Sequence, residues 1–308
     1  MSMMSSAASS AASAARAEAL ADEPMLPASP SSGGLFKGTV TSIKAIWRYR
    51  DLLGLLFRRE LKVRYKDSFF GFFWTFVRPL AQLLVYTIVI GHFLARGTPG
   101  YAVFVFSGLT IWQLFSEIVT GGTGAMLANG GLIKKVYLPR EVFTLGVVGS
   151  ALFNFVMQTI ILVFGTFLAG KVPTGTRLLY APLSIVIVVL FGTGLAFVLG
   201  AVNVYLRDVQ YLVEVALMWG LWSAPIVYSI SLVRKSIGGT WLYDLYVWSP
   251  ITQAALGFQR AFWVAGTPKD TVAHLGRSMI ITIGVLFVFV WICQRIFARL
   301  QSNFAQEL

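Results

Sequence analysis

The sequence predicts an all-α integral membrane protein with six transmembrane helices. Of its 308 residues, 56% are hydrophobic and only 12% are charged, whereas a soluble domain keeps about a quarter of its residues charged. The apolar residues also gather in runs close to the ~20 residues that cross a bilayer. The net charge is +12, which we interpret as cytoplasmic loops over anionic lipid headgroups rather than as a nucleic-acid surface.

The chain begins with a segment that has little to bury. Residues 1–34 are rich in Ser, Ala and Pro, and this composition favours disorder. We therefore predict a disordered tail over residues 1–40. The segment has neither the basic start nor the apolar run of a signal peptide, so we expect none.

Residues 41–70 are predicted to form an amphipathic helix that lies in the membrane interface. At about 100° per residue, charged and apolar side chains fall on opposite sides of this helix. The charged side comprises Lys44, Arg48, Asp51, Arg58, Arg59, Lys62 and Lys66. The apolar side comprises Ile43, Ile46, Trp47, Leu53, Leu56, Phe57 and Leu61. The alternative is a helix that packs its apolar face on a protein core.

Residues 71–308 are predicted to form the transmembrane domain. Its six apolar segments are 72–95, 101–119, 142–170, 178–206, 212–233 and 278–294. Six spans place both termini on the same side of the membrane. With the N-terminus in the cytoplasm, the inner segments hold about twice as many Lys and Arg as the outer ones, as the positive-inside rule requires. We predict a multi-pass protein of the cytoplasmic (inner) membrane with both termini in the cytoplasm.

The segment between the fifth and sixth spans, residues 236–266, is aromatic and apolar but interrupted. Gly238, Gly239, Asp244 and the pair Ser249-Pro250 divide it into parts that are too short to span the bilayer. We predict short re-entrant or interfacial helices on the outer face. A seventh span is the alternative, and it would place the C-terminus outside.

The sequence offers little for catalysis or for metal binding. The stretch GTFLAGKV, residues 165–172, nearly matches a phosphate-binding loop, but Val172 lacks the hydroxyl that would hold Mg²⁺. The two histidines, His92 and His274, are far apart and have no cysteine cluster nearby. We expect no catalytic residue, no metal and no cofactor in this chain. A membrane glycosyltransferase is the rival enzyme class, but it would need clustered carboxylates.

A basic cluster lies where the interfacial helix meets the first span. Its cations would attract a phosphate or pyrophosphate headgroup, and ordinary anchoring to headgroups explains them equally well. The cluster comprises Arg58, Arg59, Lys62, Arg64 and Lys66.

Several stretches resemble the type-2 ABC permeases that export polysaccharides such as O-antigen, galactan and teichoic acid. RRELKVRYKDSFFGFFW followed by RPL is similar to their N-terminal signature, with Glu60 in place of the usual Asp. GGLIKKVYLPREVF resembles their loop between the second and third spans. Further similarity lies in YLRDVQYLVEVALMWGLWSAPIVYS (205–229), SPITQAALGFQRAF (249–262) and FARLQSNFAQEL (297–308). The resemblance covers about residues 58–308.

The resemblance implies that the loop at residues 132–141 is a coupling helix that docks on a separate ATPase subunit. It offers an apolar ridge flanked by charges, and Pro139 would end the helix. Without the resemblance, lysines that merely enforce topology would explain the loop as well. The predicted coupling residues are Leu132, Ile133, Lys134, Lys135, Val136, Tyr137, Leu138, Pro139, Arg140 and Glu141.

The resemblance further implies the membrane permease subunit of an ATP-driven exporter for a lipid-linked polysaccharide. Two copies of the chain would form the pathway, and two ABC ATPase subunits would bind ATP and Mg²⁺. Membrane lipid would be a further partner and nucleic acid would not. Export of teichoic acid, a drug or a lipid, and secondary transport without ATP, remain alternatives.

A sugar polymer needs hydrogen bonds and flat faces along its path, because its hydroxyls lose water inside a membrane. Aromatic candidates for lining the pathway are Trp74, Tyr86, Trp112, Phe115, Trp219, Trp222 and Tyr228. The alternative for each is a packed or lipid-facing side chain. The polar residues Gln82, Gln113, Asn154 and Gln158 lie inside spans and are expected to face protein or the pathway. An outer gate is predicted at Trp241, Tyr243, Trp248 and Phe262.

Overall fold

The computed structural model describes residues 44, 47–65, 99–134, 138–266 and 271–307, together with six single positions between 77 and 88. The side chains of residues 60–65, 303, 305 and 306 are outside this description. Within these ranges the chain forms helices and turns without a β-strand, which confirms the all-α prediction for them. The helices are α3 (Arg50–Tyr65), α6 (Tyr101–Ala128), α7 (Gly130–Ile133), α8 (Glu141–Leu168), η3 (Gly175–Leu179), α9 (Tyr180–Tyr205), α10 (Val209–Ser223), α11 (Ile230–Ile237), α12 (Trp241–Trp248), α13 (Pro250–Phe262), α14 (Leu275–Leu300), η5 (Gln301–Asn303) and α15 (Phe304–Glu307).

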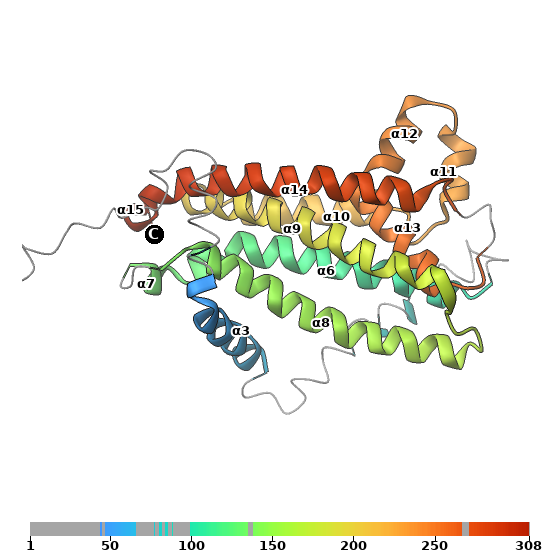
Figure 1. Cartoon of the computed structure of the whole chain (residues 1–308), viewed down its shortest axis with the longest axis horizontal. Coiled ribbons are helices and arrows are strands. Elements are labelled where there is room, and N and C mark those ends of the chain that lie inside the picture. The colour runs from blue at the N-terminus through green and yellow to red at the C-terminus, as the bar shows by residue number, and fades with distance from the viewer. Residues whose placement is uncertain are drawn as a thin grey trace, which may run out of the picture.

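The long helices run side by side along the longest axis of the molecule (Figure 1). α9 lies between α6 and α14 and contacts both along its length, while α8 packs on α6. The short helices α11, α12 and α13 gather at one end, here named the α13 end. The opposite end holds α7 and α15 and is named the α7 end. α3 packs against α8.

In the part of the chain that the structure describes, four helical segments are long and apolar enough to cross a membrane: Tyr101–Ala128, Glu141–Leu168, Gly175–Tyr205 and Leu275–Leu300. They correspond to the second, third, fourth and sixth predicted spans. The first predicted span, 72–95, lies outside the described residues apart from single positions. Six spans are therefore not established, although an apolar helical membrane domain is.

The second span is predicted to end at residue 119, near Glu117, because a charge disfavours a bilayer position. The helix α6 continues beyond this position to Ala128. In the folded chain this carboxylate accepts hydrogen bonds from two amides. A charged residue that is hydrogen-bonded within the protein does not have to mark a helix end.

The helix at the fifth predicted span is interrupted, so the prediction of a single span over residues 212–233 is wrong. α10 ends at Ser223 after 15 residues, or about 22 Å at the usual rise per residue. Pro225 follows, and a proline biases the residue before it towards extended backbone. Ala224 has that conformation, with φ −94° and ψ 151°.

The non-helical segment after α10 is buried and its carbonyls are satisfied by side chains. The Tyr101 hydroxyl donates to the carbonyl oxygen of Val227 at 2.8 Å. Nε2 of Gln259 donates to the carbonyl oxygen of Pro225 at 2.9 Å. Gly108 permits this approach, because a Cβ there would lie 3.2 Å from Cα of Ile226. Irregular backbone is tolerated at membrane depth only when it is buried in protein in this way.

Close packing between α6 and α9 rests on small residues. A Cβ on Gly200 would lie 2.7 Å from the carbonyl oxygen of Gly122. Nδ2 of Asn203 donates to the carbonyl oxygen of Thr123 at 3.0 Å across the same interface. Small residues that let helix backbones approach are typical of membrane bundles. This interface holds the helix that carries the candidate site.

The outward faces of the bundle are strongly apolar. On α8, Val156, Ile160, Phe164 and Leu168 are all exposed and recur every four residues. The exposed residues of α14 include Val285, Val288 and Ile292. Continuous apolar stripes of this length are rare on soluble proteins and suit contact with lipid chains.

The stretch that resembles a phosphate-binding loop is a helix end. Gly170 has φ +65° after the last turn of α8. Its N–H donates to the carbonyl oxygen of Phe167, and the N–H of Lys171 donates to that of Thr166. This pair of bonds is a Schellman motif, in which a glycine with positive φ follows the end of a helix. The motif explains why Gly170 stands at this position without a bound nucleotide.

Candidate functional site

A polar groove runs along one face of α6, and we name it the α6 groove. Its volume is about 480 Å³. α8 contributes Val147, Ser150 and Ala151, and the start of α10 contributes Gln210. The residues of α6 and its C-terminal cap that line the groove are Gln113, Ser116, Glu117, Thr120, Gly121, Gly124, Ala125, Ala128 and Asn129.

The spacing of the α6 residues explains why they share one face. Positions 113, 116, 117, 120, 121 and 124 follow the helical periodicity, and all are partly exposed. The residues between them, such as Leu114, Ile118 and Val119, are buried. The groove therefore presents hydroxyls, amides, a carboxylate and glycine backbone in a bundle whose other faces are apolar.

Glu117 is at the centre of the polar network in this groove. Its Oε2 accepts a hydrogen bond from Nδ2 of Asn154 at 2.6 Å, and its Oε1 accepts one from Nε2 of Gln113 at 3.2 Å. From the sequence, Gln113 and Asn154 are expected to face protein or the pathway, and both donate hydrogen bonds to this carboxylate. Glu117 is not among the predicted site residues, because its charge suggests the end of a span. The sequence does contain a signal for this pair, namely a glutamate four residues after a glutamine within an apolar run, because side chains at this spacing are neighbours on a helix.

Gln210 closes the other side of the groove. Its Nε2 donates to Oε1 of Glu214 at 3.4 Å. Its Oε1 is buried and has no hydrogen-bond partner among the described residues, and it would lie 3.5 Å from a Cβ on Gly124. An open acceptor beside a glycine leaves a polar position that a hydroxyl of a bound molecule can fill. Gln210 is not among the predicted site residues, because it lies outside the predicted spans.

The groove reaches the α7 end at Asn129, where α3 joins it. Nη1 of Arg59 donates to Oδ1 of Asn129 at 3.2 Å, and Nδ2 of Asn129 donates to the carbonyl oxygen of Ala125 at 2.9 Å. Arg59 belongs to the predicted basic cluster. Arg58 is exposed on the same helix, Lys62 and Arg64 are placed by backbone only, and Lys66 lies outside the described residues. The structure thus brings one cation of the cluster to the end of the groove.

α3 attaches to the bundle through the apolar side that the sequence predicted. Leu56 is buried, and Phe57 packs near Gly149, where a Cβ would lie 3.3 Å from its ring. Trp47 remains 70% exposed. The helix thus has a protein-packed portion beside an exposed aromatic residue, and its position in the membrane interface remains a prediction.

Of the predicted coupling segment, the structure describes residues 132–134 and 138–141, and the first two of these belong to the short helix α7. Ile133 is buried, whereas Lys134 is exposed and Leu132, Leu138, Pro139 and Arg140 are partly exposed. Lys135, Val136 and Tyr137 lie outside the described residues. Pro139 lies two residues before the start of α8, and its role in ending a coupling helix remains a prediction.

Glu141 anchors the coupling segment to the C-terminal helix. It is 2% exposed, and its Oε1 accepts a hydrogen bond from Nε2 of Gln294 at 3.1 Å. Oε1 of Gln294 in turn accepts hydrogen bonds from Nε and Nη2 of Arg295. The guanidinium of Arg140 lies 5.3 Å from the ring centre of Phe304. The segment is therefore tied to α14 and α15 by polar and cation–π contacts.

The predicted pathway aromatics divide into buried and exposed groups. Trp112 and Phe115 are buried, and Phe115 stacks on Phe191 with ring centres 5.5 Å apart. Trp219 and Trp222 on α10 are 68% and 51% exposed. The Tyr228 hydroxyl donates to the carbonyl oxygen of Trp222 at 2.9 Å. Trp74 and Tyr86 lie outside the described residues.

The predicted outer gate also combines exposed and packed side chains. Trp241 and Trp248 of α12 are 72% and 49% exposed, whereas Phe262 is buried. The Tyr243 hydroxyl accepts a hydrogen bond from Nε of Arg234 at 3.0 Å. Burial, and then the hydrogen bond with Tyr228, raises the pKa of Tyr246, so Tyr246 is uncharged at neutral pH.

Membrane-length apolar helices beside a polar groove are typical of an integral membrane protein. In the described residues no group of His, Cys, Asp and Glu could hold a metal ion. The ABC-2 type transporter family model matches residues 51–263, and the chain belongs to this family. Its members are membrane subunits that work with a separate ABC ATPase, which confirms the predicted transport class.

Individual relatives extend the comparison over most of the chain. The O-antigen export system permease protein RfbA of Myxococcus xanthus is 29% identical over 266 residues, covering 86% of this chain and 98% of the relative. The O-antigen export system permease protein RfbA of Klebsiella pneumoniae is 26% identical over 84% of this chain and 95% of the relative. The polysialic acid transport protein KpsM of Escherichia coli is 25% identical over 64% of this chain and 75% of the relative.

Proposed function

We propose that this protein is the membrane permease subunit of an ATP-driven exporter for a lipid-linked polysaccharide. The α6 groove is the observation that carries the proposal. A sugar chain has many hydroxyls that need partners away from water. The groove supplies the carboxylate of Glu117, the amides of Gln113 and Gln210 and the hydroxyls of Ser116 and Thr120. The similarity to O-antigen and polysialic acid transport proteins supports this choice of cargo.

In this proposal the groove is one wall of the pathway. A second copy of the chain completes it, and two ATPase subunits supply ATP, Mg²⁺ and force. The α7 end faces the cytoplasm together with both termini. The basic cluster around Arg59 receives the lipid pyrophosphate, because Arg59 reaches the groove through Asn129 and an arginine can bind phosphate in a bidentate manner.

The coupling segment transmits the motion of the ATPase to the groove. α7 follows α6 after one residue, Asn129, and the segment also contacts α14 through Glu141. A push on residues 132–141 therefore reaches the helix that lines the groove through rigid elements. The aromatics Trp219, Trp222 and Tyr228 face sugar rings, and Trp241, Tyr243, Trp248 and Phe262 narrow the exit.

The central test is transport by the purified chain with its ATPase in proteoliposomes. The readout is movement of a lipid-linked polysaccharide into the lumen on addition of ATP. A Walker-defective ATPase is the control. Movement of the polysaccharide that needs ATP supports the proposal. Export of a lipid or a drug without the polysaccharide, or movement on an ion gradient without ATP, would overturn it.

The coupling role is tested with the double variant Tyr137→Glu and Leu138→Glu. We expect ATP hydrolysis to continue while export stops, because charge in an apolar docking ridge weakens the contact with the ATPase. Leu168→Glu is the matched control, since Leu168 is an exposed leucine at the opposite end of α8. Normal export by the double variant would refute the role of the segment.

A further inference from the structure

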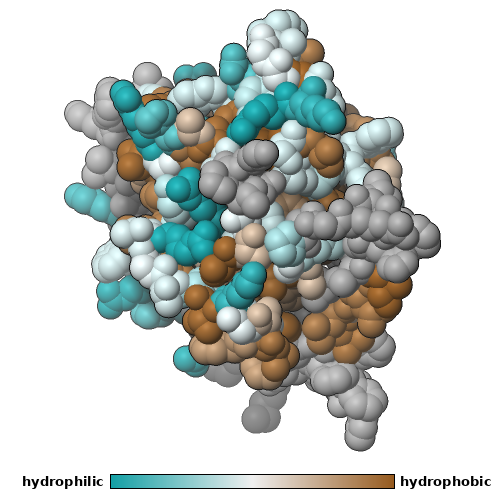
Figure 2. Space-filling view, turned by 90° about the vertical axis from the view of Figure 1, so that its right-hand side faces the viewer, coloured by the Kyte–Doolittle hydropathy of each residue, from teal (hydrophilic) through white to brown (hydrophobic). Residues whose placement is uncertain are grey.

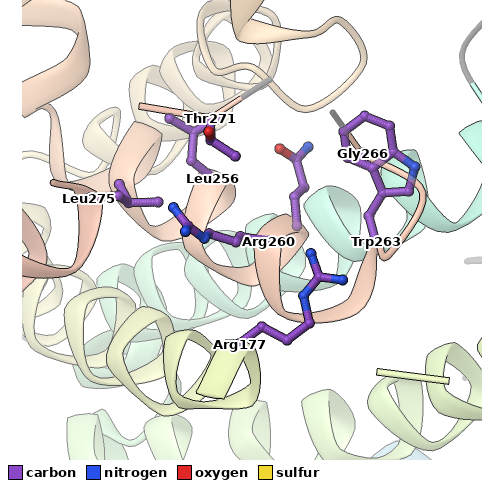
Figure 3. Close-up of a pocket in the computed structure, with 8 residues that line it drawn as sticks. Arg177, Leu256, Arg260, Trp263, Gly266, Thr271 and Leu275 are labelled. Carbon is purple, nitrogen blue, oxygen red and sulfur yellow. The ribbon is translucent and has the colours of Figure 1, made fainter. Parts of the chain in front are cut away.

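Two arginines line neighbouring cavities at the α13 end, and we name this site the arginine pocket. Arg177 comes from η3 and Arg260 from α13, and both line the two cavities. The larger cavity has a volume of about 360 Å³. Figure 3 shows the arginines extending from different elements, with Arg177 directed towards Trp263 and Arg260 towards Leu275. Figure 2 views this end of the bundle and shows hydrophilic residues beside apolar ones.

The described lining of this pocket is positively charged. Among the residues that the structure describes, the two arginines are its charged members, and neither cavity is lined by an aspartate or a glutamate. The guanidinium of Arg260 lies 4.6 Å from the ring centre of Tyr180, which holds its plane without neutralising it. The nearby Arg234 is engaged differently, since it donates to Tyr243 and to the carbonyl oxygen of Thr271. The positive charge of the two guanidinium groups favours an anion in these cavities.

The surroundings of the pocket indicate an anion that is attached to lipid. Leu179, Leu183 and Ile280 line the larger cavity together with the arginines, and Leu179 and Ile280 are 63% and 61% exposed. These residues lie at the start of two membrane-length segments, Gly175–Tyr205 and Leu275–Leu300. The pocket is thus placed where a polar headgroup meets hydrocarbon, with apolar side chains along which an acyl or prenyl chain can lie.

We propose that the arginine pocket binds the phosphate group of a membrane lipid at the α13 end. The planar guanidinium donates paired hydrogen bonds that match phosphate geometry. The site is far from the basic cluster of α3, which lies towards the α7 end (Figure 1). The bundle would then hold lipid phosphate at two separate positions. This proposal concerns binding alone, so it stands or falls independently of the exported cargo.

The test measures lipid binding to the full chain in phosphatidylcholine nanodiscs. The probes are short-chain phosphatidylglycerol and a polyprenyl pyrophosphate. Arg177→Gln and Arg260→Gln are each expected to weaken binding about tenfold, the order of affinity that a hydrogen bond to a charged group contributes. Arg277→Gln is the matched control, because Arg277 is exposed on the first turn of α14 and lines neither cavity.

The outcomes separate the sources of the phosphate. Weakened binding of both probes supports a general phosphate site, and weakened binding of one probe supports the site and identifies bulk lipid or the polyprenyl carrier as its source. Unchanged binding of both probes in both variants, or equal weakening by Arg277→Gln, overturns the proposal. Arg177→Lys guards against misfolding, since it keeps the charge and should lose only the paired geometry. Its melting temperature should equal that of the parent protein.

Discussion

The α6 groove and the arginine pocket are both hollows in one apolar bundle, but their polar groups differ in kind. Among the described residues, the groove holds Glu117 with amide and hydroxyl groups and is lined by no lysine or arginine. In the same part of the chain, the pocket holds Arg177 and Arg260 and is lined by no carboxylate. Hydroxyls suit a neutral sugar, whereas guanidinium groups suit phosphate. A lipid-linked polysaccharide carries both chemistries, so one chain can serve both parts of it.

The two hollows also differ in how their polar groups are satisfied. In the groove, Glu117 already accepts two hydrogen bonds from the protein, so the network contributes to stability. In the pocket, Arg260 contacts the Tyr180 ring, which leaves its guanidinium charge without a carboxylate partner among the described residues. Changes in the groove should therefore affect folding, and changes in the pocket should affect binding with little effect on folding.

The largest loss of stability is expected from Gly200→Ala, which acts on the α6–α9 interface beside the groove. The new methyl would lie 2.7 Å from the carbonyl oxygen of Gly122, and backbone cannot yield as a side chain can. Overpacking of this kind costs about 1–3 kcal/mol or more. The free energy of unfolding in detergent measures it. Gly284→Ala is the control, since nothing lies within 4 Å of a Cβ there; equal stability of the two variants would contradict the packing argument.

The next largest effect is expected from Glu117→Leu. The variant removes the acceptor that lies 2.6 Å from Nδ2 of Asn154, and the loss of a buried partner costs about 1–3 kcal/mol. Glu117→Gln should cost less, because the amide keeps one acceptor oxygen. Unfolding of both variants, with export measured in parallel, checks the order. If the leucine variant were as stable as the parent protein, the network would not support the groove.

Gly124→Leu should have a small effect on stability and a large one on export. A Cβ at this position would make only ordinary contact, 3.5 Å from Oε1 of Gln210, so the side chain is expected to project into the groove. Transport should fall while ATP hydrolysis and the melting temperature stay close to those of the parent protein. Gly124→Ala is the control and should transport normally. Unimpaired export by the leucine variant would place the pathway elsewhere.

The smallest effect on stability is expected from salt, which should separate the two hollows. Raising ionic strength from about 0.1 M to 1 M shortens the Debye length from ~10 Å to ~3 Å. Lipid-phosphate binding at the partly exposed arginines should weaken severalfold, whereas the melting temperature should change little. Titration of phosphatidylglycerol at two salt concentrations measures this. Binding that is insensitive to salt would argue against a charge-driven site.

Parts of the candidate site were predictable from sequence because single residues carried them. Gln113 and Asn154 stand out as amides within apolar runs, and such groups need partners in a membrane. Their partner, Glu117, was not predicted, because a charged residue in a hydropathy profile favours a span boundary. Only the packing of α8 on α6 brings Asn154 to the carboxylate. Arg177 and Arg260 likewise lie 83 positions apart and line the same cavities only in the folded chain.

The sequence by itself determined that this is an apolar helical membrane chain of the ABC-2 type transporter family, because composition and local motifs are properties of the residues alone. It could not fix the length of α6, the break after α10 or the partners of Glu117. Those features depend on contacts between distant helices, such as the hydrogen bond from Gln259 to the carbonyl of Pro225. Helical periodicity indicates which residues need burial. Only the tertiary structure decides which polar groups come into contact inside the helical bundle.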